Sequence, residues 1–365
     1  MTAVVLPSLT IRSLQGDYAV NFEDHIEQVV QRFVKDQPST VLLADRQVAK
    51  LYGQQLAPLL EARPTLLLDA TEEEKTLTGV TKVVRWLQDQ QCTRQTVVIA
   101  LGGGVIQDIA TFASHIYYRG IPWVFIPTTL LSMGDSCIGA KCGINLREFK
   151  NQLGVFHAPS EVIICTEFLA SLGDLAFRSG CGEMYRLMLT GSRHYVEEFQ
   201  NAVRTVGLHQ IDLPKCIYRS LEVKKGIIEL DEHERDLRRI LNFGHTFGHA
   251  LEALTEYEVP HGLAVVWGLD LVNYIACRRG ILQPELFASI NQFIKEHFAI
   301  QLTHKLDAHE LIRYAKRDKK VAGGKLNLIV MEEPGRLKIL KTPFDEALLE
   351  LVSEFIAGPH AFRCN

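Results

Sequence analysis

Three histidines in the second half of the sequence have the spacing of a metal site. His245 and His249 are four residues apart, so on a helix both imidazoles project from the same face. His261 follows after a short segment and precedes a glycine, which lets a second element return to that face. A lone histidine is usually an ordinary core residue, but imidazole is also a common ligand of zinc. Three histidines in this pattern favour a divalent metal centre.

A carboxylate upstream fits the same site. Glu183 lies within residues 182–186, where the pattern predicts the start of a helix. One carboxylate and two imidazoles form a ligand set typical of catalytic zinc, which keeps open positions for substrate oxygens. We therefore expect Glu183 and the histidines to converge in the folded chain.

A run of glycines indicates a second candidate site, for phosphate. Residues 97–101 predict a buried strand, and Gly102, Gly103 and Gly104 follow it, with Asp108 shortly after. Glycine lets the backbone approach a ligand closely, and the N-terminus of a following helix offers N–H groups to a phosphate. The spacing differs from G-x-G-x-x-G, so a structural turn is an equal alternative.

Polar and basic residues surround the next predicted strand. Thr128 and Thr129 end it, and their hydroxyls fit either a helix cap or a cofactor contact. Basic groups that alternate with glycines and strong apolar runs favour a phosphate site over a solvated loop. The anion-binding candidates are Arg119, Lys141, Arg147, Lys150 and Asn151.

Two more charged segments contain candidates. Residues 231–239 are a charge run, for which a solvent-exposed face is the default interpretation. Arg238 is the exception, because it lies four residues before Asn242 and beside the histidines, where it could bind a phosphate or a carboxylate. Lys319 and Lys320 fit either an exposed turn or a lysine that closes over an anion.

The composition is that of an ordinary globular protein. The chain has 365 residues, 47% hydrophobic and 22% charged, which is enough for a large core and two domains. A net charge of −4 argues against a nucleic-acid partner. The N-terminus has no signal pattern and no apolar run reaches about 18 residues, so we expect no membrane association and a cytoplasmic protein. Eight cysteines without C-x-x-C spacing fit reduced thiols.

The elements that must position these residues change in character along the chain. Up to about residue 165, short apolar runs alternate with helical segments, which predicts an α/β domain with a parallel sheet. The predicted strands are residues 41–45, 65–68, 96–101 and 123–127, and the helices 46–60 and 74–90. Helical periodicity dominates from about residue 168, where only residues 326–331 predict a strand. We expect two domains, 1–170 and 171–365, with catalysis in the cleft between them.

Taken together, the motifs resemble those of the 3-dehydroquinate synthase family of sugar phosphate cyclases, from about residue 40 to 335. Each motif is weak by itself, but several in a fixed order are specific. The matching segments are GGGVIQD, YYRG, PTTLL, DSCIGAK, KNQLGVF, GEMYR, RSLEVKK, DEHERDLRRILNFGHTFGH, HG and DKK.

The resemblance implies an N-terminal Rossmann-like domain that binds NAD and a mostly α-helical C-terminal domain that binds a divalent metal, zinc or cobalt, within a homodimer. It implies Glu183, His245 and His261 as metal ligands. The implied cofactor contacts are Asp45, Glu72, Lys75, Gly103, Gly104, Asp108, Thr128 and Thr129. The implied catalytic residues are Asp135, Lys141, Lys224, Arg238, Asn242 and His249. The implied substrate contacts are Arg119, which is expected to reach the neighbouring subunit, Asn151, Arg186, and Lys319 or Lys320.

The resemblance also implies a reaction, a carbon–oxygen lyase cycle without net redox change. NAD oxidises a secondary alcohol bound to the metal, and the new carbonyl acidifies the adjacent C–H so that phosphate leaves by elimination. NADH then returns the hydride, the ring opens, and an intramolecular aldol step closes a carbocycle. The protein must therefore polarise one oxygen, stabilise an enolate and hold one conformer.

Arg186 is the sharpest departure from the family pattern, which has lysine at this position. A guanidinium is planar, bulkier than an ammonium and does not readily lose a proton, so the change bears on substrate recognition. Arg238 and Asn242 favour a substrate with a carboxylate, 3-deoxy-D-arabino-heptulosonate 7-phosphate. The alternatives are a sedoheptulose 7-phosphate cyclase that makes a valiolone-type cyclitol, an NAD-dependent polyol dehydrogenase of the iron-containing alcohol dehydrogenase group, and a non-catalytic homologue.

Overall fold

The chain folds into two compact units. One comprises Met1–Gly173 with Ile228–His233, and the other Asp174–Ile227 with Glu234–Asn365. The computed structural model describes residues 6–34, 39–147, 149–303, 305–316, 321–322, 325–358 and 362–364. Within these residues, no helix has the length and apolar character needed to cross a membrane. The assignment of a cofactor domain and a metal domain to residues 1–170 and 171–365 stays a prediction.

The first unit is built on a sheet in the order β1-β2-β9-β6-β5-β3-β4, in which only the edge strand β1 runs antiparallel to its neighbour. Four strands confirm the predicted ones: β3 (Thr40–Asp45), β4 (Thr65–Leu68), β5 (Val97–Gly102) and β6 (Trp123–Pro127). The central strands β3, β5 and β6 are nearly all buried, as expected for strands covered on both faces. The remaining strands are β1 (Leu9–Ile11), β2 (Tyr18–Phe22) and β9 (Glu161–Ile164), with a separate hairpin of β7 (Ile144–Leu146) and β8 (Phe149–Leu153).

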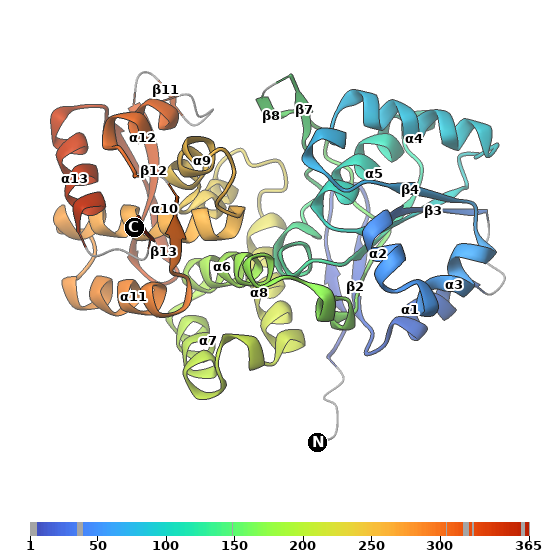
Figure 1. Cartoon of the computed structure of the whole chain (residues 1–365), viewed down its shortest axis with the longest axis horizontal. Helices are drawn as coiled ribbons and strands as arrows, with labels where there is room; N and C mark the ends of the chain where they lie inside the picture. The colour runs from blue at the N-terminus through green and yellow to red at the C-terminus, as the bar shows by residue number, and fades with distance from the viewer. Residues whose placement is uncertain are drawn as a thin grey trace. The chain divides into compact units, whose positions relative to one another are not determined.

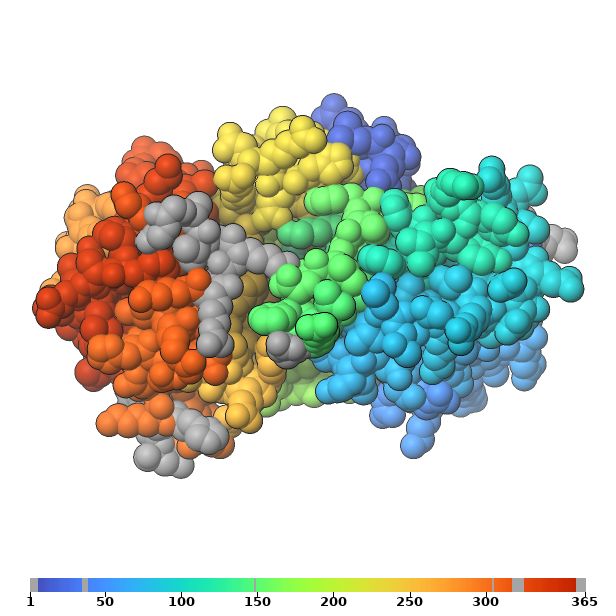
Figure 2. Space-filling model, turned by 90° about the horizontal axis from the view of Figure 1, so that it is seen from above, coloured from blue at the N-terminus to red at the C-terminus, as the bar shows by residue number. Residues whose placement is uncertain are grey.

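Helices cover both faces of this sheet (Figure 1). On one face, α4 (Leu77–Asp89) and α5 (Gly104–Ile116) pack side by side, and Figure 2 shows them in cyan and blue-green at the surface. The other face carries α1 (Ile26–Val34), α2 (Arg46–Leu51) and α3 (Gly53–Ala62). After β3 the chain forms β4 on one side of β3 and then crosses over to form β5 on the other side. The order of the strands therefore reverses between β3 and β5, and ligands of such sheets bind at the carboxyl ends of the strands at this switch point.

The second unit is mostly helical, as predicted, and α10 is its core. Helix α10 (His261–Arg278) is apolar on nearly all sides and buried along most of its length, so other elements must surround it. It contacts α6, α9, α11, α13 and β12. The other α-helices described in this unit are α6 (Asp174–Gly191), α7 (Arg193–Val206), α8 (Leu213–Ile228), α9 (His245–Leu254), α11 (Pro284–His297), α12 (Ala308–Ala315) and α13 (Glu346–Ala357).

Two expectations for this unit are wrong. The sequence predicted a single strand in this unit, at residues 326–331. That strand is β12 (Lys325–Glu333), but a second strand, β13 (Arg336–Pro343), pairs with it antiparallel. Strand β13 is largely exposed and carries charged residues, which hid its apolar pattern. Glu183 lies in the middle of a helix and not at its start, because α6 begins at Asp174. Short strands β10 (Ile300–Leu302), β11 (Val321–Ala322) and β14 (Phe362–Cys364) also occur.

Glycines let three helices of the second unit approach one another closely. The N–H of Gly262, in α10, donates to Ser179 Oγ of α6 at 2.8 Å. A Cβ at position 262 would lie 1.9 Å from the Ser179 carbonyl oxygen, so no other residue fits without a shift of backbone. Gly244 precedes α9 with φ of +82°, and a Cβ there would lie 2.4 Å from the Val265 carbonyl oxygen.

A buried carboxyl group lies between α10 and α11. Asp270 is 1% exposed, and its two oxygens accept hydrogen bonds from Asn291 Nδ2 at 3.0 and 2.8 Å. Burial raises the pKa of Asp270 to about 7, although Asn291 and Lys295 favour the charged form. The second unit therefore contains an acid whose charge is costly at neutral pH.

The close contact of α6 and α10 predicts a large effect of one methyl group. Gly262→Ala should lower the free energy of unfolding by about 3 kcal/mol, because backbone atoms must move to accommodate the Cβ. The matched control is Gly226→Ala in α8, where a Cβ meets nothing within 4 Å. That variant should raise the free energy of unfolding by up to about 1 kcal/mol. Urea denaturation of both variants measures the difference, and equal stabilities would contradict the close contact.

Asp270→Asn should stabilise the protein in a pH-dependent way. The folded state binds the Asp270 proton more tightly than the unfolded chain, so the stability this group gives is lost as the pH rises from about 4 to about 7. The amide cannot ionise, so the advantage of the variant should be about 2 kcal/mol larger at pH 8 than at pH 5. Urea denaturation at both pH values measures it, and a constant difference would show that Asp270 does not titrate in this range.

Candidate active site

The three histidines of the second unit converge, as their spacing predicts. His245 and His249 lie on the first turns of α9, and His261 is the first residue of α10. One nitrogen of each ring lies within 4.8 Å of the others, so the three could hold one metal ion. The ring centroids are 5.3 to 5.6 Å apart. His249 is exposed, whereas His245 and His261 are partly buried.

Glu183 of α6 joins this cluster. Its Oε1 lies 3.3 Å from His261 Nε2 and 3.9 Å from His245 Nε2. The Glu183 side chain is 1% exposed, and Oε1 accepts no hydrogen bond from the described part of the chain. A buried carboxylate oxygen without a hydrogen bond is costly, and a cation between Glu183 and the histidines would remove that cost.

Hydrogen bonds determine which nitrogens face Glu183. His245 Nδ1 lies 3.2 Å from the Phe243 carbonyl oxygen, and His261 Nδ1 lies 3.0 Å from Glu252 Oε2. A carbonyl or carboxylate oxygen accepts and does not donate, so each Nδ1 carries the hydrogen. In the neutral form of each ring the lone pair is then on Nε2, the nitrogen that faces Glu183.

Arg186 contacts the other oxygen of Glu183. Its Nε donates to Glu183 Oε2 at 2.6 Å, one helical turn along α6, and both side chains are almost completely buried. The pair leaves Oε1 as the oxygen nearest the histidines. The departure from the family lysine therefore lies in direct contact with a predicted metal ligand.

Other predicted residues of this unit lie on neighbouring elements. Lys224 of α8 and Arg238 of η6 (Leu237–Asn242) are both buried, and η6 contacts α6. Asn242 Nδ2 donates to Glu234 Oε1 at 2.6 Å. Lys319 and Lys320 lie outside the described residues.

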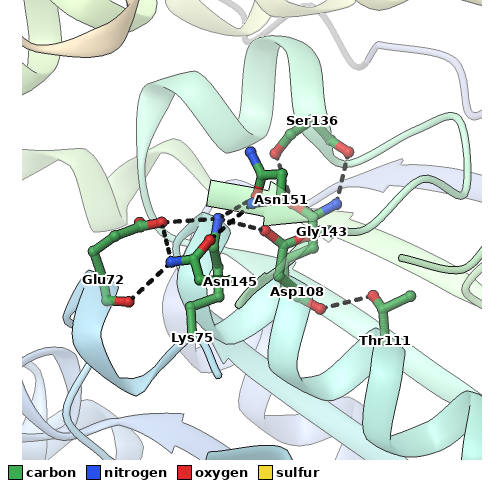
Figure 3. A network of polar contacts seen from close by, with 9 residues as sticks. Glu72, Lys75, Asp108, Thr111, Ser136, Gly143, Asn145 and Asn151 are labelled. Carbon is green, nitrogen blue, oxygen red and sulfur yellow. Dashed lines mark hydrogen bonds and ion pairs between the residues drawn. The ribbon is translucent and has the colours of Figure 1, made fainter. Parts of the chain in front are cut away.

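The first unit brings together predicted cofactor residues from η1 (Glu72–Glu74) and α5, and a predicted substrate contact from β8 (Figure 3). Lys75 Nζ lies 3.2 Å from both Glu72 Oε1 and Asp108 Oδ2, and it donates to Asn151 Oδ1 at 2.8 Å. Gly143 N donates to the other oxygen of Asp108 at 3.0 Å. Asn151, predicted as a substrate contact, is thus joined directly to the predicted cofactor residues.

Lys75 and Glu72 stabilise each other's charge, whereas burial raises the pKa of Asp108 above its ordinary value. Burial alone would lower the pKa of Lys75, but Asp108 and Glu72 raise it above its ordinary value. Burial alone would raise the pKa of Glu72, but the Asn145 hydrogen bond and Lys75 lower it. Lys75 and Glu72 are therefore both charged at neutral pH.

The carboxyl ends of β3, β5 and β6 carry the other cofactor candidates. Gly103 precedes α5, and no described side chain caps that end of the helix, whose first N–H groups can therefore bind an anion. A Cβ at Gly104 would meet nothing within 4 Å, whereas at Gly103 it would lie 2.9 Å from Thr129 Cγ2. Asp45 caps α2 by accepting from Gln47 N at 2.8 Å. Thr129 Oγ1 shares a 2.7 Å hydrogen bond with Ser132 Oγ, which fits the capping alternative.

The remaining predicted residues of the first unit lie in irregular segments. Arg119 is exposed and has φ of +66° at the end of η2 (Tyr117–Arg119). Asp135 lies in the π-helical turn Ser132–Ser136, next to the buried Gly134. Lys141 is exposed and pairs in an isolated bridge with Phe156. Thr128 follows β6 and is buried.

Two residues of these networks escaped the sequence analysis, Asn145 and Glu252. Asn145 Nδ2 donates to Glu72 Oε1 at 2.8 Å, and its Oδ1 accepts from Asn151 N at 2.9 Å (Figure 3). No sequence pattern pointed to it, because these contacts join separate elements. Glu252 had a signal, since it follows His249 by three residues and shares a face of α9 with both histidines.

Comparison with known proteins identifies the family. The family models 3-dehydroquinate synthase N-terminal and 3-dehydroquinate synthase C-terminal match residues 65–179 and 180–321. The 3-dehydroquinate synthase of Alkaliphilus metalliredigens is 37% identical over 310 residues, which cover 83% of this chain and 86% of that protein.

Solved structures have the same fold. A 2-deoxy-scyllo-inosose synthase complexed with carbaglucose-6-phosphate, NAD+ and Co2+ aligns with a TM-score of 0.84 and 22% identity, over 97% of this chain and 100% of that one. The 2-epi-5-epi-valiolone synthase ValA from Streptomyces hygroscopicus subsp. jinggangensis, with NAD+ and Zn2+ bound, aligns with a TM-score of 0.81 and 25% identity, over 96% and 99%. With both halves matched by the family models, this chain belongs to the 3-dehydroquinate synthase family of sugar phosphate cyclases.

Proposed function

We propose that this chain converts 3-deoxy-D-arabino-heptulosonate 7-phosphate to 3-dehydroquinate with release of phosphate. The observation that carries the proposal is the convergence of Glu183, His245, His249 and His261 in a chain that is 37% identical to a 3-dehydroquinate synthase over 310 residues. A non-catalytic homologue would have no need to keep this donor set.

Glu183, His245 and His261 would hold a divalent cation, zinc or cobalt. Their donor set of one carboxylate oxygen and two Nε2 atoms fits such an ion. His249 could replace Glu183 by distance alone, but Glu183 Oε1 is buried without a hydrogen bond from the described residues, whereas His249 is exposed. We assign His249 to proton transfer with the substrate.

NAD would bind at the carboxyl ends of β3 and β5. The N-terminus of α5 offers its N–H groups to the pyrophosphate beside Gly103 and Gly104. Asp45 ends β3, and Thr128 and Thr129 follow β6, the strand beside β5. The charged network of Glu72, Lys75 and Asp108 completes the proposed cofactor site.

The two groups supply chemistry that no side chain offers: NAD accepts and returns a hydride, and the cation polarises a substrate oxygen. The chain must orient the substrate and move protons. Lys224, together with His249, is assigned to orienting the reacting end and sharing protons with it. Further contacts with the substrate are assigned to Asp135, Lys141, Arg238 and Asn242. Arg119, Asn151 and one of Lys319 and Lys320 are assigned to the phosphate and other anionic groups.

A sedoheptulose 7-phosphate cyclase is the second candidate, and the departure from the family pattern at Arg186 is the reason to test it. Arg186 differs from the family lysine and contacts Glu183 directly, so it alters the surroundings of the proposed metal. Arg238 and Asn242 favour the heptulosonate, because they suit a carboxylate. An NAD-dependent polyol dehydrogenase fits less well, since it has no need for several phosphate-binding candidates.

The cellular setting follows from the proposed reaction. A biosynthetic enzyme of this kind works in the cytoplasm, with a small sugar phosphate as its partner and neither nucleic acid nor membrane. We propose a homodimer, in which the exposed Arg119 reaches the neighbouring subunit's site.

Phosphate release tests the substrate. The protein with NAD and Co2+ should release phosphate from 3-deoxy-D-arabino-heptulosonate 7-phosphate and form 3-dehydroquinate, with no net NADH. Release from sedoheptulose 7-phosphate alone would make the second candidate correct. Net NADH from a free polyol would select the dehydrogenase. Glu183→Ala should lose cation binding and turnover together, because it removes the carboxylate donor.

Asn145→Ala tests the cofactor site. The variant loses the hydrogen bonds to Glu72 and to the Asn151 backbone, so the affinity for NAD should fall about tenfold. Isothermal titration calorimetry with NAD measures the dissociation constant. Gln95→Ala, which removes an exposed amide in the same unit, is the control and should bind NAD like the unchanged protein. Equal affinities of the Asn145 variant and the control would contradict the assignment of this network to NAD.

A further inference from the structure

Glu252 lies beside the histidine cluster without belonging to the predicted ligand set. It follows His245 by seven residues and His249 by three on α9, so all three side chains lie on one face of the helix. Its Oε2 lies 3.0 Å from His261 Nδ1, and its side chain is only 12% exposed. The contact joins α9 to the first residue of α10.

The geometry excludes Glu252 as a ligand of the same ion. His261 faces Glu252 with Nδ1 and Glu183 with Nε2, at 3.0 and 3.3 Å. The two nitrogens point to opposite sides of the ring, so a cation bound to Nε2 is out of reach of the Glu252 carboxylate. The contact through which Glu252 influences the binding of that cation is its hydrogen bond with His261.

We propose that Glu252 is a positioning residue that orients His261 and strengthens it as a metal ligand. A carboxylate that accepts from Nδ1–H fixes the tautomer, holds the ring plane and makes Nε2 a better electron donor. The proposal rests on the proposed function, because it assumes a cation between Glu183 and the histidines.

His245 provides an internal comparison. Its Nδ1 faces the neutral Phe243 carbonyl oxygen at 3.2 Å, whereas His261 faces a carboxylate. The Phe243 carbonyl group, two residues back in the backbone, therefore fixes the His245 ring. The His261 ring is 34% exposed, and its Nδ1 contacts a side chain of another helix, Glu252 of α9. The effect of Glu252 is therefore specific to one ligand.

The test uses the full chain after removal of bound metal. Competition with a chromophoric chelator measures its affinity for Co2+, and the visible absorption spectrum of the bound Co2+ reports the ligand geometry. Glu252→Ala should bind Co2+ about 10- to 100-fold more weakly and change the spectrum. Glu252→Gln keeps an oxygen acceptor for Nδ1 and loses only the charge, so it should recover part of the affinity. Glu197→Ala removes an exposed carboxylate of α7 and should bind like the unchanged protein.

The outcomes separate this proposal from the proposed function. If the unchanged protein binds Co2+ and Glu252→Ala binds it with equal affinity and an equal spectrum, the positioning role is wrong and the metal site stands. If the unchanged protein does not bind Co2+, both are wrong. Far-UV circular dichroism checks that each variant is folded, and Glu252→Gln, which is nearly isosteric, decides the matter if Glu252→Ala unfolds. In that case, weaker Co2+ binding by Glu252→Gln would support the positioning role, and an affinity equal to that of the unchanged protein would overturn it.

Discussion

The close approach of α6 and α10 is the contact on which the candidate metal centre depends. Gly262 lies against the backbone of Ser179, and its N–H bonds to the serine hydroxyl. This contact places His261, the neighbouring residue, within 3.3 Å of Glu183. A larger residue at position 262 would separate the carboxylate from the imidazole. The absence of a side chain at Gly262 is therefore a requirement of the candidate metal site.

Charged side chains surround the candidate metal ligands on two sides. Arg186 binds one oxygen of Glu183 and leaves the other near the histidines. Glu252 accepts from His261 on the side away from Glu183, so negative charge is present on both sides of that ring. Two carboxylates and one guanidinium leave a net negative charge, which suits a divalent cation. In the first unit, too, opposite charges lie in direct contact, because Lys75 lies between Glu72 and Asp108.

The hairpin β7–β8 gives the first unit a link between its two predicted roles. Asn145 and Asn151, both on this hairpin, bond to Glu72 and Lys75. Asn151 was predicted as a substrate contact and Lys75 as a cofactor contact, and a single hydrogen bond joins them. Any movement of the hairpin would therefore alter the cofactor residues as well. The Lys75 ammonium group is fixed in position, because it contacts Glu72, Asp108 and Asn151 at the same time.

The sequence by itself determined the parallel strands β3 to β6, the helical second unit and the candidate ligands, because apolar periodicity and histidine spacing are local properties. It missed β13, whose exposed, charged residues carry no apolar pattern, and it placed Glu183 at the wrong point of α6. Only the tertiary structure decided that Asn145 joins Glu72 to Asn151 and that Glu252 supports His261. These contacts join elements through distances that depend on packing, which residue types and spacing do not specify.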